Sequence, residues 1–466
     1  MSLIRSGPLL NRVKNSPVAW SWLFNGLRLA FGLLLLPLVL TKLNETELGM
    51  YYVLLSLVAV VPLVDFGFGP TIGRFVSYAM GGAKVIQAQG VARPGNSNAP
   101  NYALLWELLF TTRALYRRLA LALFLILGAW GTYVVELRIE ETPSLFITRL
   151  AWAITLVGAV FDIYSNWYGV YLRSMNQVLS ATRMGVISYV LRLLVSCGLL
   201  LGGGGLLSLP VGSLMGSIVL RTWTRRKCLR LLASHPAPAH AEVGRYLKIL
   251  WPNSWRLGVQ FVSGYLTVNA NTAICLHVLG LAANAEYGLS AQLMGIAMGM
   301  AAVWTSVRWP LVGIYQARHD YAGLRRILWS RIWLQNLTYV LLALGLLLTA
   351  TELLERFAPG KSVLPREWFA LLLLNALLEM NFNIWGTLIS TTNRLPYLWP
   401  TVATNVASLL LSLSLIHLTD LGLGALVLGP LISGSVFNYW YWPFYAARGL
   451  RTSLLRFLFQ GTKAEL

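Results

Sequence analysis

Residues 119–137 read LALALFLILGAWGTYVVEL and follow directly on Arg117 and Arg118. An α-helix rises about 1.5 Å per residue, so a run of roughly 20 apolar residues crosses the ~30 Å hydrocarbon core of a bilayer. The quoted run has this length, and the paired arginines precede it. It therefore predicts a transmembrane helix that begins on the cytoplasmic side.

The same pattern recurs along the whole chain. Twelve apolar stretches are joined by more polar loops, and nearly all are long enough to span a membrane. The fifth and sixth are short and separated only by residues 202–205, and we interpret them as two spans rather than one buried hairpin. The stretches cover residues 19–40, 49–70, 119–137, 146–171, 184–201, 206–220, 252–279, 286–307, 332–351, 368–390, 397–417 and 423–445.

Basic residues are concentrated in alternate loops. If the amino terminus is cytoplasmic, 28 of the 37 Lys and Arg residues lie on the cytoplasmic side and six lie on the outer side. Basic loops resist translocation, so the bias predicts a multi-pass protein with both termini in the cytoplasm. The formal net charge of +20 is explained by loops that face anionic lipid, and we expect membrane lipid rather than nucleic acid as a partner.

Composition excludes several other classes of protein. Hydrophobic residues make up 56% and charged residues only 12%, against about 25% charged in soluble proteins. The three cysteines Cys197, Cys228 and Cys275 form no CxxC or paired framework, so no metal or redox site is expected. The chain also has no nucleotide-binding P-loop, so this chain alone does not use ATP.

The second half of the chain repeats the first. An offset of 239 matches Glu47 with Glu286 and Gly49 with Gly288. We therefore predict an all-α membrane protein of twelve transmembrane helices in two pseudo-symmetric six-helix bundles, residues 1–232 and 233–466, with a central cavity near the midplane. An offset of 217 places the fourth span over the tenth and aligns Asp162 with Glu379, Asn166 with Asn383, Gly169 with Gly386, and Asn176 with Asn393.

Ionisable residues inside the apolar stretches are few. Such groups cost several kcal/mol in hydrocarbon, so they usually face a bundle interior or water and mark a pathway. Two alternatives stay open: the buried charges pair with one another and hold helices together, or the carboxylates hydrogen-bond between helices. Arg256 lies near a span end and could instead reach the interface. The candidates are the basic residues Arg28, Arg192 and Arg256 and the acidic residues Asp65, Asp162 and Glu379.

Three segments in the first half resemble a known family. They are ELGMYY at residues 47–52, DFGFGP at 65–70 and RFVSYA at 74–79. These segments are similar to the opening of bacterial polysaccharide-biosynthesis flippases of the O-antigen type. That family belongs to the multidrug, oligosaccharidyl-lipid and polysaccharide exporter (MOP) superfamily. The two six-span halves extend the resemblance over nearly the whole chain.

The resemblance implies a function in the bacterial cytoplasmic (inner) membrane. Members move a polyprenyl-diphosphate-linked oligosaccharide to the outer leaflet by alternating access, for export of surface polysaccharide such as lipopolysaccharide, and a polysaccharide polymerase or other assembly protein is an expected partner. Arginines line the cavity of such proteins, and Arg28, Arg74, Arg256 and Arg308 stand at similar places here. Arg192 joins them because it lies mid-span.

No cofactor is expected, but a coupling cation would complete this mechanism. Protonation or cation binding at a buried carboxylate can bias a two-state equilibrium. Asp162 and Glu379, with Asp65 near the end of the second span, are the candidates. Proton, sodium and membrane potential alone all remain open as the driving force.

Two other functions compete with this one. A multidrug or cation exporter of the same superfamily would use acidic residues to attract its substrate. A membrane polysaccharide polymerase or glycosyltransferase would need a substantial outer loop, whereas the longest is about 15 residues, near 352–367, and no Asp-x-Asp or HExxH motif is present. We therefore expect a transporter rather than an enzyme.

Overall fold

The computed structural model describes residues 15–59, 61–90, 99–137, 139–238, 243–357 and 362–460. Every regular element within these ranges is a helix. The helices divide into two compact units, Met1–Ile86 with Gly95–Pro252, and Gln87–Pro94 with Asn253–Leu466. The division along the chain thus falls after Pro252, within a long helix.

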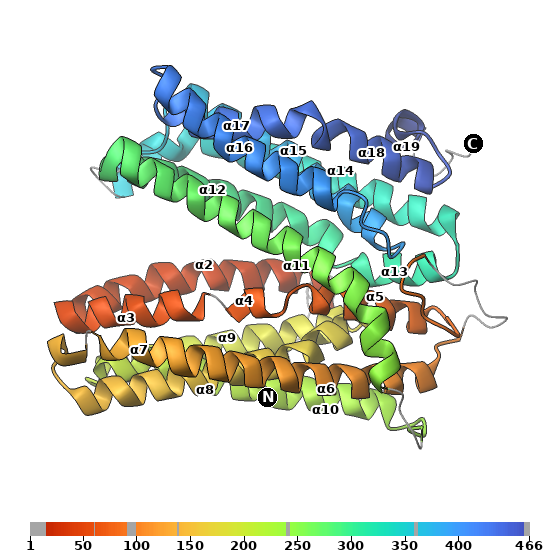
Figure 1. Ribbon diagram of the computed structural model, residues 1–466, viewed down its shortest axis with the longest axis horizontal. Coiled ribbons are helices and arrows are strands. Elements are labelled where there is room, and N and C mark those ends of the chain that lie inside the picture. The colour runs from red at the N-terminus through yellow and green to blue at the C-terminus, as the bar shows by residue number, and fades with distance from the viewer. Residues whose placement is uncertain are drawn as a thin grey trace, which may run out of the picture. The chain divides into compact units, whose positions relative to one another are not determined.

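The helices of each unit lie side by side (Figure 1). The first unit holds α2 (Pro17–Lys42), α3 (Glu45–Val58), α4 (Val61–Val64), α5 (Phe68–Met80), α6 (Tyr102–Ile126), η1 (Leu127–Gly131), α7 (Thr132–Glu136), η2 (Ile139–Glu141), α8 (Leu145–Ser174), α9 (Val178–Leu201), η3 (Gly205–Leu207) and α10 (Ser208–Leu232). The long helix α11 (Val243–Ile274) begins in the first unit and continues into the second. The second unit further holds η4 (Cys275–Leu279), α12 (Gly280–Ser306), α13 (Trp309–Ala317), α14 (Tyr321–Phe357), α15 (Arg366–Ser390), α16 (Leu398–Leu418), α17 (Leu423–Val436), α18 (Asn438–Gly449) and α19 (Leu454–Gln460).

The predicted fold class is confirmed. Each of the twelve apolar stretches coincides with a helix or with a run of consecutive helices. Nine helical segments of the described chain meet both the length and the apolarity that a membrane span requires. The short fifth and sixth stretches are the separate helices α9 and α10, as expected. Tyr102–Ile126 is one continuous helix, so the segment before residue 119 extends the third span.

The second apolar stretch is not one helix, because the backbone turns at Asp65. Phe66 and Gly67 have positive φ angles of 42° and 77°, which a right-handed helix cannot contain. The Asp65 carboxylate accepts a hydrogen bond from the backbone N–H of Gly69 at 3.0 Å and another from the Tyr116 hydroxyl. This carboxylate therefore caps the first turn of α5, where unpaired backbone donors would otherwise be buried.

In each unit, a glycine of one helix packs closely against a serine of the neighbouring helix. A Cβ atom added to Gly212 of α10 would lie 2.1 Å from Ser196 Oγ of α9. A Cβ added to Gly429 of α17 would lie 2.0 Å from Ser412 Oγ of α16. The two glycines are 217 residues apart, which is the offset found in the sequence between the fourth and tenth spans. Small residues that allow close backbone approach are typical of membrane helix pairs.

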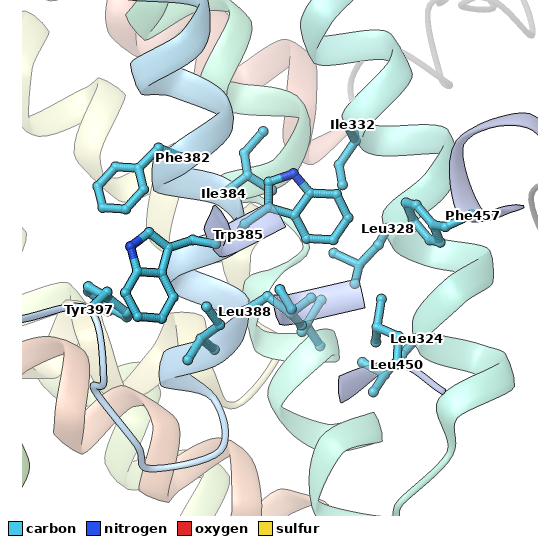
Figure 2. Packing of buried hydrophobic residues seen from close by; sticks show 14 of the residues in the cluster. Leu324, Leu328, Ile332, Phe382, Ile384, Trp385, Leu388, Tyr397, Leu450 and Phe457 are labelled. Carbon is cyan, nitrogen blue, oxygen red and sulfur yellow. The ribbon is translucent and has the colours of Figure 1, made fainter. Parts of the chain in front are cut away.

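Aromatic packing fixes the carboxyl-terminal end of the second unit. Figure 2 shows Trp385 of α15 among Leu328 and Ile332 of α14 and Phe457 of α19. The rings of Trp385 and Phe457 meet edge to face, with centroids 5.6 Å apart. The short helix α19 is also held by two indole N–H groups, from Trp329 and Trp333, which donate to the Leu458 carbonyl at 3.0 and 3.2 Å.

We predict that Gly212→Val and Gly429→Val each destabilise the protein, because overpacking a close helix contact costs about 1–3 kcal/mol. The melting temperature in detergent should fall by roughly 2–4 °C for each kcal/mol. Gly198→Val and Gly345→Val are matched controls, since a Cβ at either position meets nothing within 4 Å. Equal melting temperatures for all four variants would contradict the assigned contacts.

Candidate functional site

Polar side chains form an exposed stripe on one half of α8. Between residues 159 and 174 only Asp162, Asn166 and Arg173 are exposed. Eleven residues separate the first from the last, which is about 16 Å along a helix. Exposed charged and amide groups over that depth are not compatible with contact to lipid.

The stripe lies opposite the apolar exposed side of the same helix. Phe146 and Val157, in the first half of α8, are 74% and 53% exposed. At 3.6 residues per turn, these two positions lie about 160–180° around the helix from the mean direction of the polar stripe. One side of α8 is thus suited to lipid and the other to water.

The corresponding helix in the second unit carries the same arrangement. Between residues 375 and 390 of α15 only Glu379, Asn383 and Thr387 are exposed, each four residues after the previous one. Every other side chain in that stretch is at least partly buried. A helix that hides its apolar residues and exposes three polar ones at i, i+4 and i+8 presents a hydrophilic face.

The backbone confirms that the two helices are repeats. Asn176 and Asn393, just beyond the ends of α8 and α15, both adopt left-handed conformations, with φ of 61° and 56°. Asparagine tolerates this conformation better than most residues with a side chain. The two polar stripes are therefore equivalent features of a duplicated structure.

Asp162 has polar and charged neighbours on the two adjacent helices. The Ser217 side chain of α10 hydrogen-bonds to it, and Arg192 of α9 attracts its carboxylate. The Arg192 guanidinium also lies 5.8 Å from the centre of the Tyr189 ring. Close packing positions this arginine, because a Cβ on Gly216 of α10 would lie 3.1 Å from the Arg192 Cβ. The arrangement is a charged and polar cluster inside the first unit.

Glu379 has aromatic neighbours instead. It interacts electrostatically with Tyr287 of α12, Tyr339 of α14 and Tyr439 of α18. Two of these hydroxyl groups donate elsewhere, Tyr339 to the Leu373 carbonyl and Tyr439 to the Asn375 side chain, both at 2.8 Å. Within the described chain no basic residue pairs with Glu379. The two equivalent carboxylates therefore differ in charge compensation.

Two arginines lie close together in the second unit. Arg308 stands at the break between α12 and α13, and Arg331 lies ten residues into α14, about 15 Å from its start. Both are half-buried, and the positive charge of Arg308 acts on Arg331. Over the part of the chain that the structure describes, neither forms an ion pair with a carboxylate. Each is therefore available for an anion.

The other predicted arginines have different surroundings. Arg74 of α5 is buried, donates to the Thr71 hydroxyl at 3.3 Å and acts electrostatically on Tyr78. Arg256 of α11 is half-buried, with its guanidinium 5.4 Å from the centre of the Trp255 ring. Arg28 belongs to α2, but its side chain lies outside the described residues.

Sequence reasoning missed several members of these clusters. Arg331 directly precedes the apolar stretch 332–351, so the sequence pattern alone places it in a loop, whereas α14 begins at Tyr321. Arg173 likewise lies beyond the apolar stretch 146–171, whereas α8 extends to Ser174. Its spacing from Asp162 and Asn166, at eleven and seven residues, is the signal that could have placed all three on one helix face.

We predict that the polar stripes are reached by water. In a background without native cysteines, Asn166→Cys and Asn383→Cys should react with a charged, membrane-impermeant maleimide at least about tenfold faster than Val157→Cys and Leu374→Cys, which occupy apolar exposed positions. Thiols react as thiolates, and these form only where the group is hydrated. The rates are measured by gel shift in membrane vesicles. Equal labelling of the polar and apolar positions would show that the stripes face lipid.

Comparison with solved structures identifies the fold. A mutant of the MATE transporter VcmN from Vibrio cholerae superposes with a TM-score of 0.71 at 16% identity, over 95% of this chain and 98% of that one. A MOP superfamily transporter from Pyrococcus furiosus, described as having a binding pocket of reverse polarity that suggests a different function, gives 0.69 at 12% identity, over 97% and 100%. An outward-facing multidrug resistance MATE transporter of the MOP superfamily gives 0.68 at 13% identity, over 94% and 97%.

Sequence comparisons add no closer relative. No family model matches the chain, and no curated protein matches it. The chain therefore has the fold of MATE transporters of the MOP superfamily.

Proposed function

We propose that this protein is a membrane transporter that exports a polyprenyl-diphosphate-linked oligosaccharide from the cytoplasmic to the outer leaflet by alternating access. The fold is that of a transporter superfamily. The family resemblance of residues 47–79 favours the oligosaccharide branch. The inner membrane of a bacterium and cytoplasmic termini belong to the same proposal.

The observation that carries the proposal is the adjacent pair Arg308 and Arg331. Two half-buried guanidinium groups that repel each other and have no carboxylate partner in the described chain are stabilised by an anion. A guanidinium fork matches the oxygens of a diphosphate, and charge-assisted hydrogen bonds of this kind are stronger than neutral ones. Arg308 lies at the break between α12 and α13, and Arg331 lies about 15 Å from the start of α14, next to its apolar stretch.

Each unit also carries a polar stripe that suits a sugar headgroup. A sugar headgroup is large and forms many hydrogen bonds, so it cannot cross hydrocarbon unaided. The amide groups of Asn166 and Asn383 are exposed on the repeated helices and offer both donors and acceptors. The polyprenyl chain would stay in lipid. We include Arg28, Arg74, Arg192 and Arg256 as further basic groups for the headgroup.

Glu379 is our choice for ion coupling. A carboxylate without a basic partner, at the depth of the membrane, is stabilised by a proton or a bound sodium ion. Asp162 is already compensated by Arg192, and Asp65 is occupied in capping α5. Asp162 and Asp65 are therefore weaker candidates for ion coupling, although Asp162 is the equivalent of Glu379 in the repeat.

A drug or cation exporter is the second candidate. It is favoured by Glu379, whose tyrosine neighbours could hold an organic cation by cation–π contact. It does not explain the arginine pair, which would repel such a substrate.

We predict that Arg308→Gln and Arg331→Gln each slow oligosaccharide transport by about 10-fold to 100-fold, since a hydrogen bond to a charged group contributes about 1.5–3 kcal/mol. The initial rate is measured in proteoliposomes with a fluorescent polyprenyl-diphosphate oligosaccharide. Arg230→Gln, at the exposed end of α10, is the charge-matched control. Transport of ethidium at a higher rate than oligosaccharide, with both arginine variants fully active, would favour the drug exporter instead.

Glu379→Gln should retain a basal transport rate but lose its acceleration by an imposed proton or sodium gradient, because the variant can neither ionise nor exchange a cation. Rates are compared in the same vesicles with and without each gradient. Glu367→Gln, at an exposed position in the first turn of α15, is the control on the same helix. Unchanged acceleration in Glu379→Gln would exclude this residue from coupling.

A further inference from the structure

A lateral groove lies in the second unit, outside the polar stripes. It has a volume of about 400 Å³ and is formed by α14, α15, α18 and α19. Its walls are mainly aromatic and aliphatic, and three of its aromatic side chains, Trp333, Trp440 and Phe444, are 46–51% exposed. Volumes of 300–1,000 Å³ are typical of sites for small ligands.

The deep end of the groove requires no polar ligand. Asn336 of α14 and Asn381 of α15 line it there, and their amide groups hydrogen-bond to each other in both directions, at 3.1 and 2.8 Å. Asn381 also donates to the Leu377 carbonyl at 2.9 Å. These polar groups are therefore satisfied, and the exposed lining of the groove favours an apolar occupant.

Arginines lie beyond the opposite end of the groove, on the same helix faces but outside its lining. On α18, Trp440, Phe444 and Arg448 are exposed at successive intervals of four residues, so they lie on one helix face. On α14, Arg326 is exposed seven residues before Trp333, again on the same face. On each helix, an arginine therefore lies beyond the aromatic residues of the groove. That arginine lies at the helix end that is expected to be cytoplasmic from the distribution of basic residues among the loops.

The groove, lined on α14 by Ile332, Trp333 and Asn336, covers the depth of one leaflet only together with the flanking Arg326. Arg326 and Asn336 are ten residues apart, which corresponds to about 15 Å, half of the ~30 Å hydrocarbon core. The helix α19 borders the groove at its shallow end, where Leu454 and Leu458 contribute to the wall. The aromatic walls, the depth and the terminal cations together match one acyl chain attached to an anionic headgroup.

We propose that this groove binds one anionic phospholipid of the cytoplasmic leaflet, with an acyl chain between α14 and α18 and its phosphate near Arg326 and Arg448. Basic pockets between membrane helices on the cytoplasmic side bind anionic lipids in this manner. The proposal does not depend on the identity of the transport substrate.

The test uses the full-length protein in detergent and measures lipid binding by native mass spectrometry. Dioleoyl phosphatidylglycerol should bind as a single saturable molecule, at least about fivefold more tightly than dioleoyl phosphatidylcholine. Arg326→Gln and Arg448→Gln should each weaken phosphatidylglycerol binding about fivefold, because one basic residue near the surface contributes about 1 kcal/mol. Binding of phosphatidylcholine should not change.

Two further variants distinguish lipid binding in the groove from attraction of anionic lipid by the overall positive charge of the protein. Arg226→Gln removes an exposed arginine at the end of α10 in the first unit and should leave phosphatidylglycerol binding unchanged. Leu454→Trp fills the shallow end and should weaken both lipids; if it does not fold, the exposed arginine variants still decide the question. Equal binding of both lipids to the native protein, or equal loss in the Arg226 variant, would mean annular lipid only. Tight binding of a polyprenyl phosphate that phosphatidylglycerol does not displace would also overturn the proposal.

Discussion

The high cost of unsolvated polar groups in hydrocarbon is the constraint on which this structure depends. Helices satisfy the backbone, so the side chains decide which face meets lipid. On α8 the apolar and polar exposed residues lie on opposite sides. On α15 nearly everything in the second half is buried except three polar groups. We therefore expect water, rather than lipid, to be in contact with Asp162 and Glu379.

The sequence allowed the spans to be predicted well because a membrane helix has a strong and simple signature. A run of about twenty apolar residues is rarely found outside a membrane helix, and the basic loops indicate which end of each helix is cytoplasmic. The break at Asp65 could not be foreseen from hydropathy, because residues 61–70 are apolar on average and the turn depends on a carboxylate reaching the backbone of Gly69. Turn chemistry of this kind is decided by local hydrogen bonds, which an average over a window does not detect.

The candidate site was only partly predictable, for a different reason. A helix continues beyond its apolar core, so charges that seem to lie in loops can be on membrane helices. Arg331 lies ten residues inside α14. Arg221 lies in the middle of α10, 4.3 and 4.5 Å from the centres of the Phe161 and Tyr164 rings of α8. The sequence indicated Asp162 and Glu379 correctly as equivalent positions, but their different neighbours come from helices distant in sequence.

Divergence between the two units is what gives the duplicated helices distinct chemistry. Arg192, which attracts Asp162, corresponds at the same offset to Leu409 in the second unit. One carboxylate therefore has a fixed counter-charge, whereas among the described residues the charge of Glu379 interacts with tyrosines and with no basic group. A compensated charge holds helices together in a single state, because separating it leaves two buried ions. A carboxylate without a counter-charge is more stable in water when ionised and more stable in a buried position when it has gained a proton or a cation. A two-state transporter needs a residue of this kind, because binding of the ion then shifts the equilibrium between the two conformations.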